Sequence, residues 1–295
     1  MHFTSTSQFR EKIELERLFR VADSMRKPHV KGIDLVYQAR GKMMAIVTDK
    51  KDSLVSFEVA MKRLGGEVIV LGNDQSLEDT IQMANEYAEV IVLNHSHKDA
   101  VQIATEASRV PVINGGEGNG ENPVQALSDV YSILKEFGEV DNINIEMVGN
   151  LAMGVVRSLI HLLGFYEDVK IKFTPQSNFG LLAADCELLD SLGIHHFVGK
   201  EPDVMYITRL CGLTDFFIDE YLLGKNLPES SIKEFDIRSI SPNTIVLHSQ
   251  FRSEDLPLVL RKDPRCAIWR QVRSGIRVRT ALLYNLFNHN KYTVA

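Results

Sequence analysis

The chain has 295 residues, of which 44% are hydrophobic and 24% are charged, a balance typical of folded globular proteins and not of disordered ones. At roughly 150 residues per domain, this length predicts two domains. Lysine and arginine number 33 and aspartate and glutamate 39, for a net charge of −6. That charge gives no electrostatic reason to expect a nucleic acid or an anionic membrane surface as a partner.

Further features narrow the class of protein. No apolar run reaches the roughly 18 residues of a membrane helix, and the first residues lack the basic-then-apolar pattern of a signal peptide. The three cysteines, Cys186, Cys211 and Cys266, are too widely spaced to indicate a disulfide framework or a zinc site. We therefore expect a cytoplasmic protein that binds no metal and no other cofactor.

The first part of the chain alternates between amphipathic helices and short apolar strands. Apolar residues recur at helical spacing between Phe9 and Ala22, which predicts a helix there. The strands that follow are expected at 43–47, 67–71, 90–93 and 110–113, and the helices at 53–64, 77–87 and 98–108. This alternation predicts βαβ units, in which a parallel sheet is covered by helices on both faces.

A glycine-rich segment, 114–120, interrupts the alternation. After it, a long helix is expected from Pro123 to Phe137, since proline is tolerated in the first turn of a helix. A second series then has strands at 143–148, 169–173, 203–207 and 244–247, with helices at 153–163, 179–192 and 276–288. The predicted fold class is α/β, with two doubly wound parallel-sheet domains joined by helices.

Two positions at the ends of predicted strands could bind an anion. Lys50, Lys51, Asp52 and Ser53 lie between a strand and the start of a helix, where free N–H groups and the helix dipole favour negative charge; Asp52 or Ser53 could instead cap the helix itself. Arg209 follows a predicted strand, where open α/β sheets bind ligands. Its guanidinium suits either an anion clamp or a surface salt bridge.

Three other patterns carry less functional information. Residues 149–154 join a strand to a helix, but their glycine spacing does not match a dinucleotide-binding loop. His95 and His97 have no third metal ligand near them in sequence, so we interpret them as the end of a loop. The basic residues near the C-terminus are interpreted as a solvated or interface-pairing face; they are Arg270, Arg273, Arg277 and Arg279.

Five segments, in the same order along the chain, resemble aspartate carbamoyltransferases. They are 56–66, 114–129 with Pro123-Val124-Gln125-Ala126-Leu127, 148–159, 203–210 with Tyr206-Ile207-Thr208-Arg209, and 275–283. The resemblance covers essentially the whole chain and implies the aspartate/ornithine carbamoyltransferase fold. It also implies a carbamoyl-phosphate-type domain at 1–135 with the C-terminal helix 276–295, an amino-acid-type domain at 136–275, and a trimer with active sites between subunits.

The chain departs from this family at the positions that would bind carbamoyl phosphate. The arginine of the family's Ser-Thr-Arg-Thr loop corresponds to Asp52, and the arginine of its Arg-His-Pro motif corresponds to Asn94. Asn122 takes the place of the histidine in the His-Pro-Thr-Gln motif, whereas Gln125 is kept. The loop that carries a lysine into the neighbouring subunit's site is replaced by a short connection at 73–76.

Positions expected to bind the amino acid also differ. Val155 stands where the family has the arginine of a Gly-Arg step, and Cys211 replaces the glutamine two residues after the retained Arg209. The family's His-Pro-Leu-Pro-Arg loop has become 248–252, His-Ser-Gln-Phe-Arg. The loss of two phosphate-binding arginines alone removes roughly 3–6 kcal/mol of binding free energy, and the carboxylate of Asp52 adds repulsion.

The sequence therefore predicts a carbamoyltransferase homologue without catalytic residues. It would serve as a structural or regulatory subunit in pyrimidine or amino-acid metabolism, as a homotrimer or in a mixed trimer with an active homologue. The candidates for weak binding of a small anionic ligand are Lys50, Lys51, Ser53, Gln125 and Arg209. Two alternatives stay open: an enzyme of this fold with a changed donor or acceptor, and an active aspartate carbamoyltransferase with an atypical site.

Overall fold

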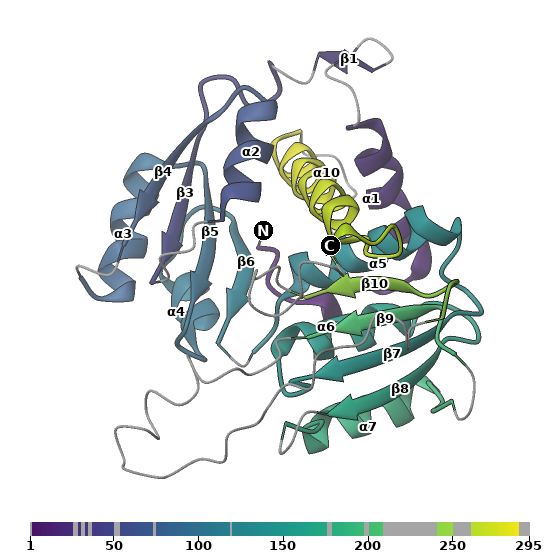
Figure 1. Ribbon diagram of the computed structural model, residues 1–295. Coiled ribbons are helices and arrows are strands. Elements are labelled where there is room, and N and C mark those ends of the chain that lie inside the picture. The colour runs from purple at the N-terminus through teal and green to yellow at the C-terminus, as the bar shows by residue number, and fades with distance from the viewer. Residues whose placement is uncertain are drawn as a thin grey trace.

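Two four-stranded sheets, each parallel throughout, form the framework of the protein (Figure 1). The structure is a computed structural model. It describes residues 2–25, 29–30, 33–34, 37–49, 54–72, 75–118, 120–175, 179–197, 201–208, 241–249 and 261–288. The parallel arrangement confirms the α/β fold class predicted from the alternating pattern.

The first sheet has the strand order β4-β3-β5-β6. Its strands are β3 (Met43–Thr48), β4 (Glu67–Leu71), β5 (Val90–His95) and β6 (Val112–Glu117). The helices between them are α2 (Val55–Arg63), α3 (Leu77–Tyr87) and α4 (Ala100–Ala107). Side chains alternate along β3, so that Ala45 and Val47 pack in a core with α3 and α4, whereas Met44 and Ile46 pack in the core that contains α2.

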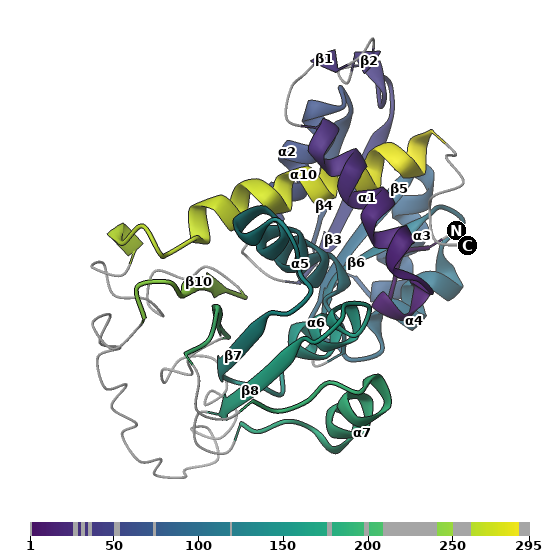
Figure 2. The ribbon, with the colours of Figure 1, turned by 90° about the vertical axis from the view of Figure 1, so that its right-hand side faces the viewer.

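The second sheet has the strand order β10-β9-β7-β8. Its strands are β7 (Asn144–Gly149), β8 (Lys170–Pro175), β9 (Val204–Ile207) and β10 (Ile245–His248). Two helices follow its first strands, α6 (Gly154–Leu163) and α7 (Ala183–Leu192). Figure 2 shows α7 at the outer side of this sheet, beside the edge strand β8.

Three long helices connect the sheets. They are α1 (Lys12–Ser24), α5 (Pro123–Phe137) and α10 (Ile268–Phe287). Helix α10 packs against α1, α2 and α5 (Figure 1), and one hydrophobic core includes Ile46 of the first sheet, Val130 of α5 and Ile145 of the second sheet. The short elements are the 3-10 helix η1 (Thr6–Gln8) and the strand pair β1 (His29–Val30) and β2 (Ile33–Asp34).

Several predicted boundaries agree with the structure, and three need correction. The helices 77–87 and 123–137 and the strand 67–71 have the predicted bounds. Strand β6, however, continues through the glycine-rich segment to Glu117, and α10 begins eight residues before the predicted position 276. Helix α7 begins at Ala183 and not at 179.

Close packing of the backbone explains why strand β6 continues beyond residue 113. A Cβ atom on Gly115 would lie 2.9 Å from Leu54 Cδ1 and 3.1 Å from the carbonyl oxygen of Leu93. Glycine therefore serves here to bring strand β6 against its neighbours and not to end the strand. Within the described ranges, no helix combines the length and the apolar character needed to cross a membrane.

The start of α6 depends on another close approach. A Cβ atom on Gly154 would lie 2.1 Å from the carbonyl oxygen of Gly120 and 3.2 Å from the Cα of Glu121. Because both neighbours are backbone atoms, they cannot rotate away. Gly154 therefore allows α6 of the second sheet to contact the segment that leads into α5.

We predict that Gly154→Ala lowers the free energy of unfolding by about 1–3 kcal/mol, the usual cost of overpacking a rigid contact. The matched control is Gly180→Ala, because a Cβ atom there would meet nothing within 4 Å. Urea denaturation followed by circular dichroism measures both changes. Equal stabilities of the two variants would contradict the proposed contact.

Candidate functional site

The ligand-binding edge of a parallel sheet is the edge where its strands end. In the first sheet this edge is formed by the ends of β3, β5 and β6 and by the residue that precedes α5. We call four of the described polar residues there, Asp49, Asn94, Glu117 and Asn122, the first-sheet rim.

Two amides of the rim, Asn94 and Asn122, meet across β6. Asn94 is the penultimate residue of β5, with 7% of its surface exposed, and Asn122 caps α5, its Oδ1 accepting a hydrogen bond of 3.3 Å from the backbone N–H of Gln125. A Cβ atom on Gly116, whose φ is +134°, would lie 3.2 Å from Asn122 Nδ2 and 3.5 Å from Asn94 Oδ1. Two neutral amides thus lie close to one another at this edge.

Two carboxylates complete the first-sheet rim. Asp49 follows β3, and its Oδ2 accepts a hydrogen bond of 2.9 Å from the backbone N–H of Ser96, whereas its buried Oδ1 has no hydrogen-bond partner among the described residues. Glu117 ends β6, and its Oε1 accepts a hydrogen bond of 2.8 Å from the backbone N–H of Val101. Burial raises the pKa of Glu117 above its ordinary value despite that hydrogen bond.

The side chains of His95 and His97 accept hydrogen bonds from nearby backbone groups. His95 Nδ1 accepts a hydrogen bond of 3.1 Å from the backbone N–H of His97, and His97 Nδ1 accepts one of 3.2 Å from the backbone N–H of Asp99. His95 Nδ1 also lies 3.8 Å from Asp49 Oδ2. Across the described residues, no group of three or more His, Cys, Asp or Glu side chains is arranged to hold a metal ion.

Gln125 is the one predicted ligand-binding residue that lies within the described ranges. Its Nε2 donates a hydrogen bond of 2.8 Å to Asp129 Oδ1, and its Oε1 accepts one of 3.3 Å from Arg279 Nη2. Both ends of the amide therefore have partners inside the protein, and the half-buried side chain is held in one orientation. The other four predicted ligand-binding residues lie outside the described residues: Lys50, Lys51, Ser53 and Arg209.

The structure describes only one of three other positions that were singled out from the sequence. Asp52 and Cys211 lie outside the described residues. Val155 is in the first turn of α6 with 3% of its surface exposed, packed in the hydrophobic core. An apolar side chain in that place cannot hold a carboxylate.

Beneath Gln125, the fully buried carboxylate of Asp129 on α5 accepts hydrogen bonds from side chains of two other elements. Its Oδ2 accepts a hydrogen bond of 2.6 Å from the hydroxyl of Tyr206 on β9, and its Oδ1 accepts one of 2.6 Å from Nε2 of Gln271 on α10. Gln271 also binds the backbone of His248 on β10, accepting from its N–H at 3.1 Å and donating to its carbonyl at 2.8 Å. We call Gln125, Asp129, Tyr206, Gln271 and Arg279 the Asp129 network.

Burial shifts the pKa values of Asp129 and Arg279 in this network. It raises the pKa of Asp129 to about 7, against hydrogen bonds from Tyr206, Gln271 and Gln125 that lower it. Burial also lowers the pKa of Arg279 to about 10, which still leaves the guanidinium charged near neutral pH. At neutral pH, the Asp129 carboxyl is thus close to the midpoint of its titration.

Arg279 corrects the interpretation of the C-terminal arginines as one solvated or interface-pairing face. Only 8% of its surface is exposed, its Nη1 donates a hydrogen bond of 3.2 Å to Ser128 Oγ, and its guanidinium lies 5.2 Å from the centroid of the Phe57 ring. Arg270 instead lies at the surface and pairs with Glu136 at 2.6 Å. Arg279 and Arg270 therefore make different kinds of contact.

Sequence reasoning missed Asp129, Gln271 and Arg279 as members of a site. The available signal was an aspartate four residues after Gln125 on an otherwise apolar helix, where the two side chains share one face. The partners on α10 lie more than 140 residues away in sequence, and no local pattern identifies them.

The sequence of this chain is similar to those of known proteins. The sequence model described as "Aspartate/ornithine carbamoyltransferase, carbamoyl-P binding domain" matches residues 1–135. "Aspartate carbamoyltransferase 1, chloroplastic" of Pisum sativum is 34% identical over 91% of this chain and 74% of its own length. The "Aspartate carbamoyltransferase catalytic subunit" of Pyrobaculum islandicum is 31% identical over 92% of this chain and 94% of its own length.

Solved structures agree with the sequence relatives. The crystal structure of aspartate transcarbamoylase from Trypanosoma cruzi in complex with carbamoyl phosphate superimposes with a TM-score of 0.82 at 28% identity, over 96% of this chain and 95% of that one. Two parallel α/β sheets joined by long helices therefore define a two-domain carbamoyltransferase fold. The chain belongs to the aspartate carbamoyltransferase family, which confirms the resemblance drawn from its sequence.

We predict that Asp129 makes the stability of the protein depend on pH. Because its pKa is about 7 in the folded chain and ordinarily 3.8, the folded chain binds this proton more tightly. The resulting stabilisation is complete below about pH 4 and is lost as the pH rises through about 7. The shift of about three units corresponds to a total on the order of 4 kcal/mol.

Urea denaturation of the wild type and of Asp129→Asn at several pH values between about 5 and 8 measures this effect. The free energy of unfolding of the wild type should fall relative to that of the variant as the pH rises. Asp79→Asn, at the exposed start of α3, is the control and should leave the wild-type slope unchanged. Parallel profiles for the wild type and Asp129→Asn would show that Asp129 does not titrate in this range.

Proposed function

We propose that this chain is a carbamoyltransferase homologue that does not transfer a carbamoyl group and acts as a structural or regulatory subunit in pyrimidine or amino-acid metabolism. The observation that carries the proposal is the chemistry of the first-sheet rim. Its four residues bring two carboxylates and two neutral amides to the edge where the fold binds ligands, and none of them is a cation.

Electrostatics argue against carbamoyl phosphate as a ligand of that rim. The phosphate group carries nearly two negative charges, and each charge-assisted hydrogen bond that would hold it contributes about 1.5–3 kcal/mol. Asn94 and Asn122 offer only neutral donors. Asp49 has a buried oxygen without a hydrogen-bond partner, and an approaching dianion would increase the cost of that buried charge.

The proposed domain division is 1–135 with 276–295 as the carbamoyl-phosphate-type domain and 136–275 as the amino-acid-type domain. Each range contains one of the two parallel sheets, and helix α10 returns from the second sheet to pack on α1 and α2. The fold is thus kept in both halves, although the binding residues have changed.

We also propose that the chain assembles as a homotrimer or in a mixed trimer with an active homologue. Val55 of α2 and Val70 of β4 are 58% and 50% exposed, and these two elements pack against each other. Strand β4 lies at the edge of the first sheet. Exposed apolar side chains on an edge strand favour burial against another subunit.

A second candidate function is supported by the amides themselves. Asn94, Asn122 and Gln125 place three neutral side chains around the start of α5, and such groups suit an uncharged polar ligand better than a phosphate. An enzyme of this fold with a changed donor or acceptor would use them, together with Lys50, Lys51 and Arg209. Micromolar binding of an uncharged carbamoyl compound, lost in Gln125→Ala, would favour this candidate.

We predict that the purified protein forms no carbamoyl-aspartate above background from carbamoyl phosphate and aspartate. The reason is that none of the four residues of the first-sheet rim is a cation that could stabilise the phosphate in the transition state. A colorimetric assay of the ureido product measures the rate, with the Pyrobaculum islandicum catalytic subunit as positive control. A turnover near one per second, in the ordinary range of enzymes, would mean that the protein is an active carbamoyltransferase with an atypical site.

A further prediction concerns assembly. Three chains of 33.3 kDa give a particle of about 100 kDa, and light scattering should report that mass for the homotrimer or for the mixed trimer. Val55→Asp with Val70→Asp should shift the particle toward the monomer. Leu182→Asp, at an exposed apolar position beside α7, should leave its mass unchanged. A wild-type monomer at all concentrations, alone and with an active homologue, would refute the assembly.

A further inference from the structure

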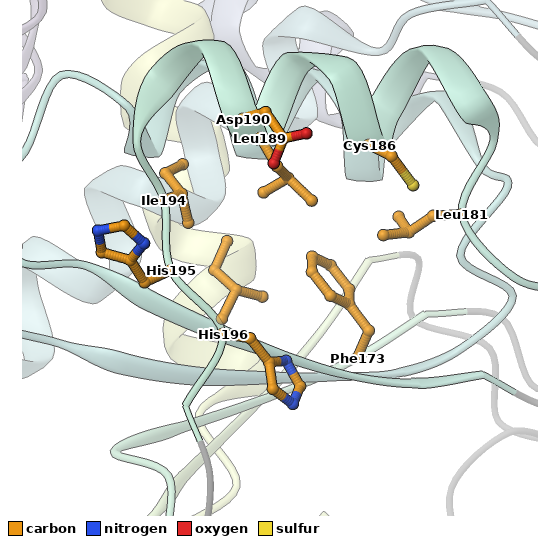
Figure 3. Close-up of a pocket in the computed structure, with 9 residues that line it drawn as sticks. Phe173, Leu181, Cys186, Leu189, Asp190, Ile194, His195 and His196 are labelled. Atoms are coloured by element: carbon orange, nitrogen blue, oxygen red, sulfur yellow. The ribbon is translucent and has the colours of Figure 1, made fainter.

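A cavity of about 320 Å³ lies between α7 and strand β8, in the second sheet (Figure 3). Strand β8 is the edge strand of that sheet, and α7 lies on the outer side of the molecule (Figures 1 and 2). None of the residues that line the cavity belongs to the first-sheet rim or to the Asp129 network. We call it the α7 cavity.

The cavity exists because α7 is anchored by an ion pair and packs only loosely on the sheet. The fully buried side chain of this helix is Asp185, whose Oδ1 lies 2.6 Å from Nε of Arg157 on α6. Leu188, Leu189 and Leu192 are only half-buried. The space is a depression that is open to solvent on one side, with Cys186 and Asp190 exposed at its edge.

Both apolar and polar residues line the α7 cavity. The apolar residues are Ile171, Phe173, Leu181, Leu189 and Ile194, and the polar residues are Cys186, Asp190, His195 and His196. Figure 3 shows His195 and Ile194 toward one end, Leu181 with Cys186 toward the other, and Asp190 beside Leu189 between them. A volume of this size is at the lower end of small-molecule sites, and a cavity of about half that volume holds a benzene ring.

The carboxylate of Asp190 determines which kind of ligand suits the cavity. Asp190 lies in the last turn of α7, where the helix dipole places partial negative charge. Its exposed carboxylate makes no hydrogen bond or ion pair with another side chain in the described part of the protein. The carboxylate and the helix end together favour a cation, and the neighbouring imidazoles can accept hydrogen bonds from it.

We propose that the α7 cavity binds a small molecule with an apolar, ring-sized body and a cationic amine head. The body packs against Phe173 and Leu189, and the ammonium group lies beside Asp190 at the C-terminal end of α7. This ligand class is independent of carbamoyl chemistry, so the proposal goes beyond the function proposed above and gives the second sheet a ligand site of its own.

Three probes of matched shape and different charge test the proposal: benzylamine, benzyl alcohol and benzoate. Titration followed by amide chemical shifts should show saturable binding of benzylamine at Phe173 and Leu189, with weaker binding of the alcohol and the weakest of benzoate. Asp190→Asn should reduce the affinity for benzylamine about three- to tenfold and leave that for benzyl alcohol unchanged. Glu187→Gln, an exposed carboxylate on the same helix outside the lining, is the matched control and should change neither.

Filling the cavity provides the second test. Cys186→Phe places a ring at the exposed mouth, and Leu189→Trp fills the wall; each should abolish binding of all three probes while the amide shifts of the first sheet stay in place. Benzylamine binding no tighter than benzoate binding would overturn the proposed charge selectivity. An absence of saturable shifts, or binding that survives both fillings, would show that the α7 cavity is only loose packing.

Discussion

The buried carboxylate of Asp129 is the constraint on which the arrangement of this protein depends. A charge without exposure to water is tolerated only when donors surround it, and here the donors come from α5, α10 and β9. Gln271 extends the same network to the backbone of β10. The second sheet therefore cannot shift against α5 and α10 without leaving a polar group unpaired, which costs about 1–3 kcal/mol or more for each group.

The same network holds Gln125 in place without a ligand. Its side chain is bound by Asp129 and Arg279 inside the protein, so its position is set by the packing of the fold. Asn122 caps α5 through its own side chain. The two hydrophobic cores contain none of the four residues of the first-sheet rim. The proposed loss of the phosphate site is therefore compatible with the formation of both sheets.

Much of this architecture could be predicted from the sequence, because strands and helices are encoded by local periodicity. The strand 67–71 and the helices 77–87 and 123–137 have the predicted bounds. Strand β6 was missed beyond 113 because Gly115 and Gly116 read as a break, whereas the close contacts of Gly115 with Leu54 and Leu93 and the positive φ of Gly116 require glycine. At the site, Gln125 was identified through family resemblance. Asp129, Gln271 and Arg279 were not, since their hydrogen bonds join residues far apart in sequence and only the fold brings them together.

The central claim is that the first-sheet rim, with its carboxylates and amides, does not bind carbamoyl phosphate. Isothermal titration calorimetry of the purified protein with carbamoyl phosphate tests this most directly, with inorganic phosphate titrated in parallel. We predict no saturable heat below about millimolar concentration, because two carboxylates and two neutral amides cannot offset the cost of association and of desolvating a dianion. Saturable binding of carbamoyl phosphate at micromolar concentration would contradict it.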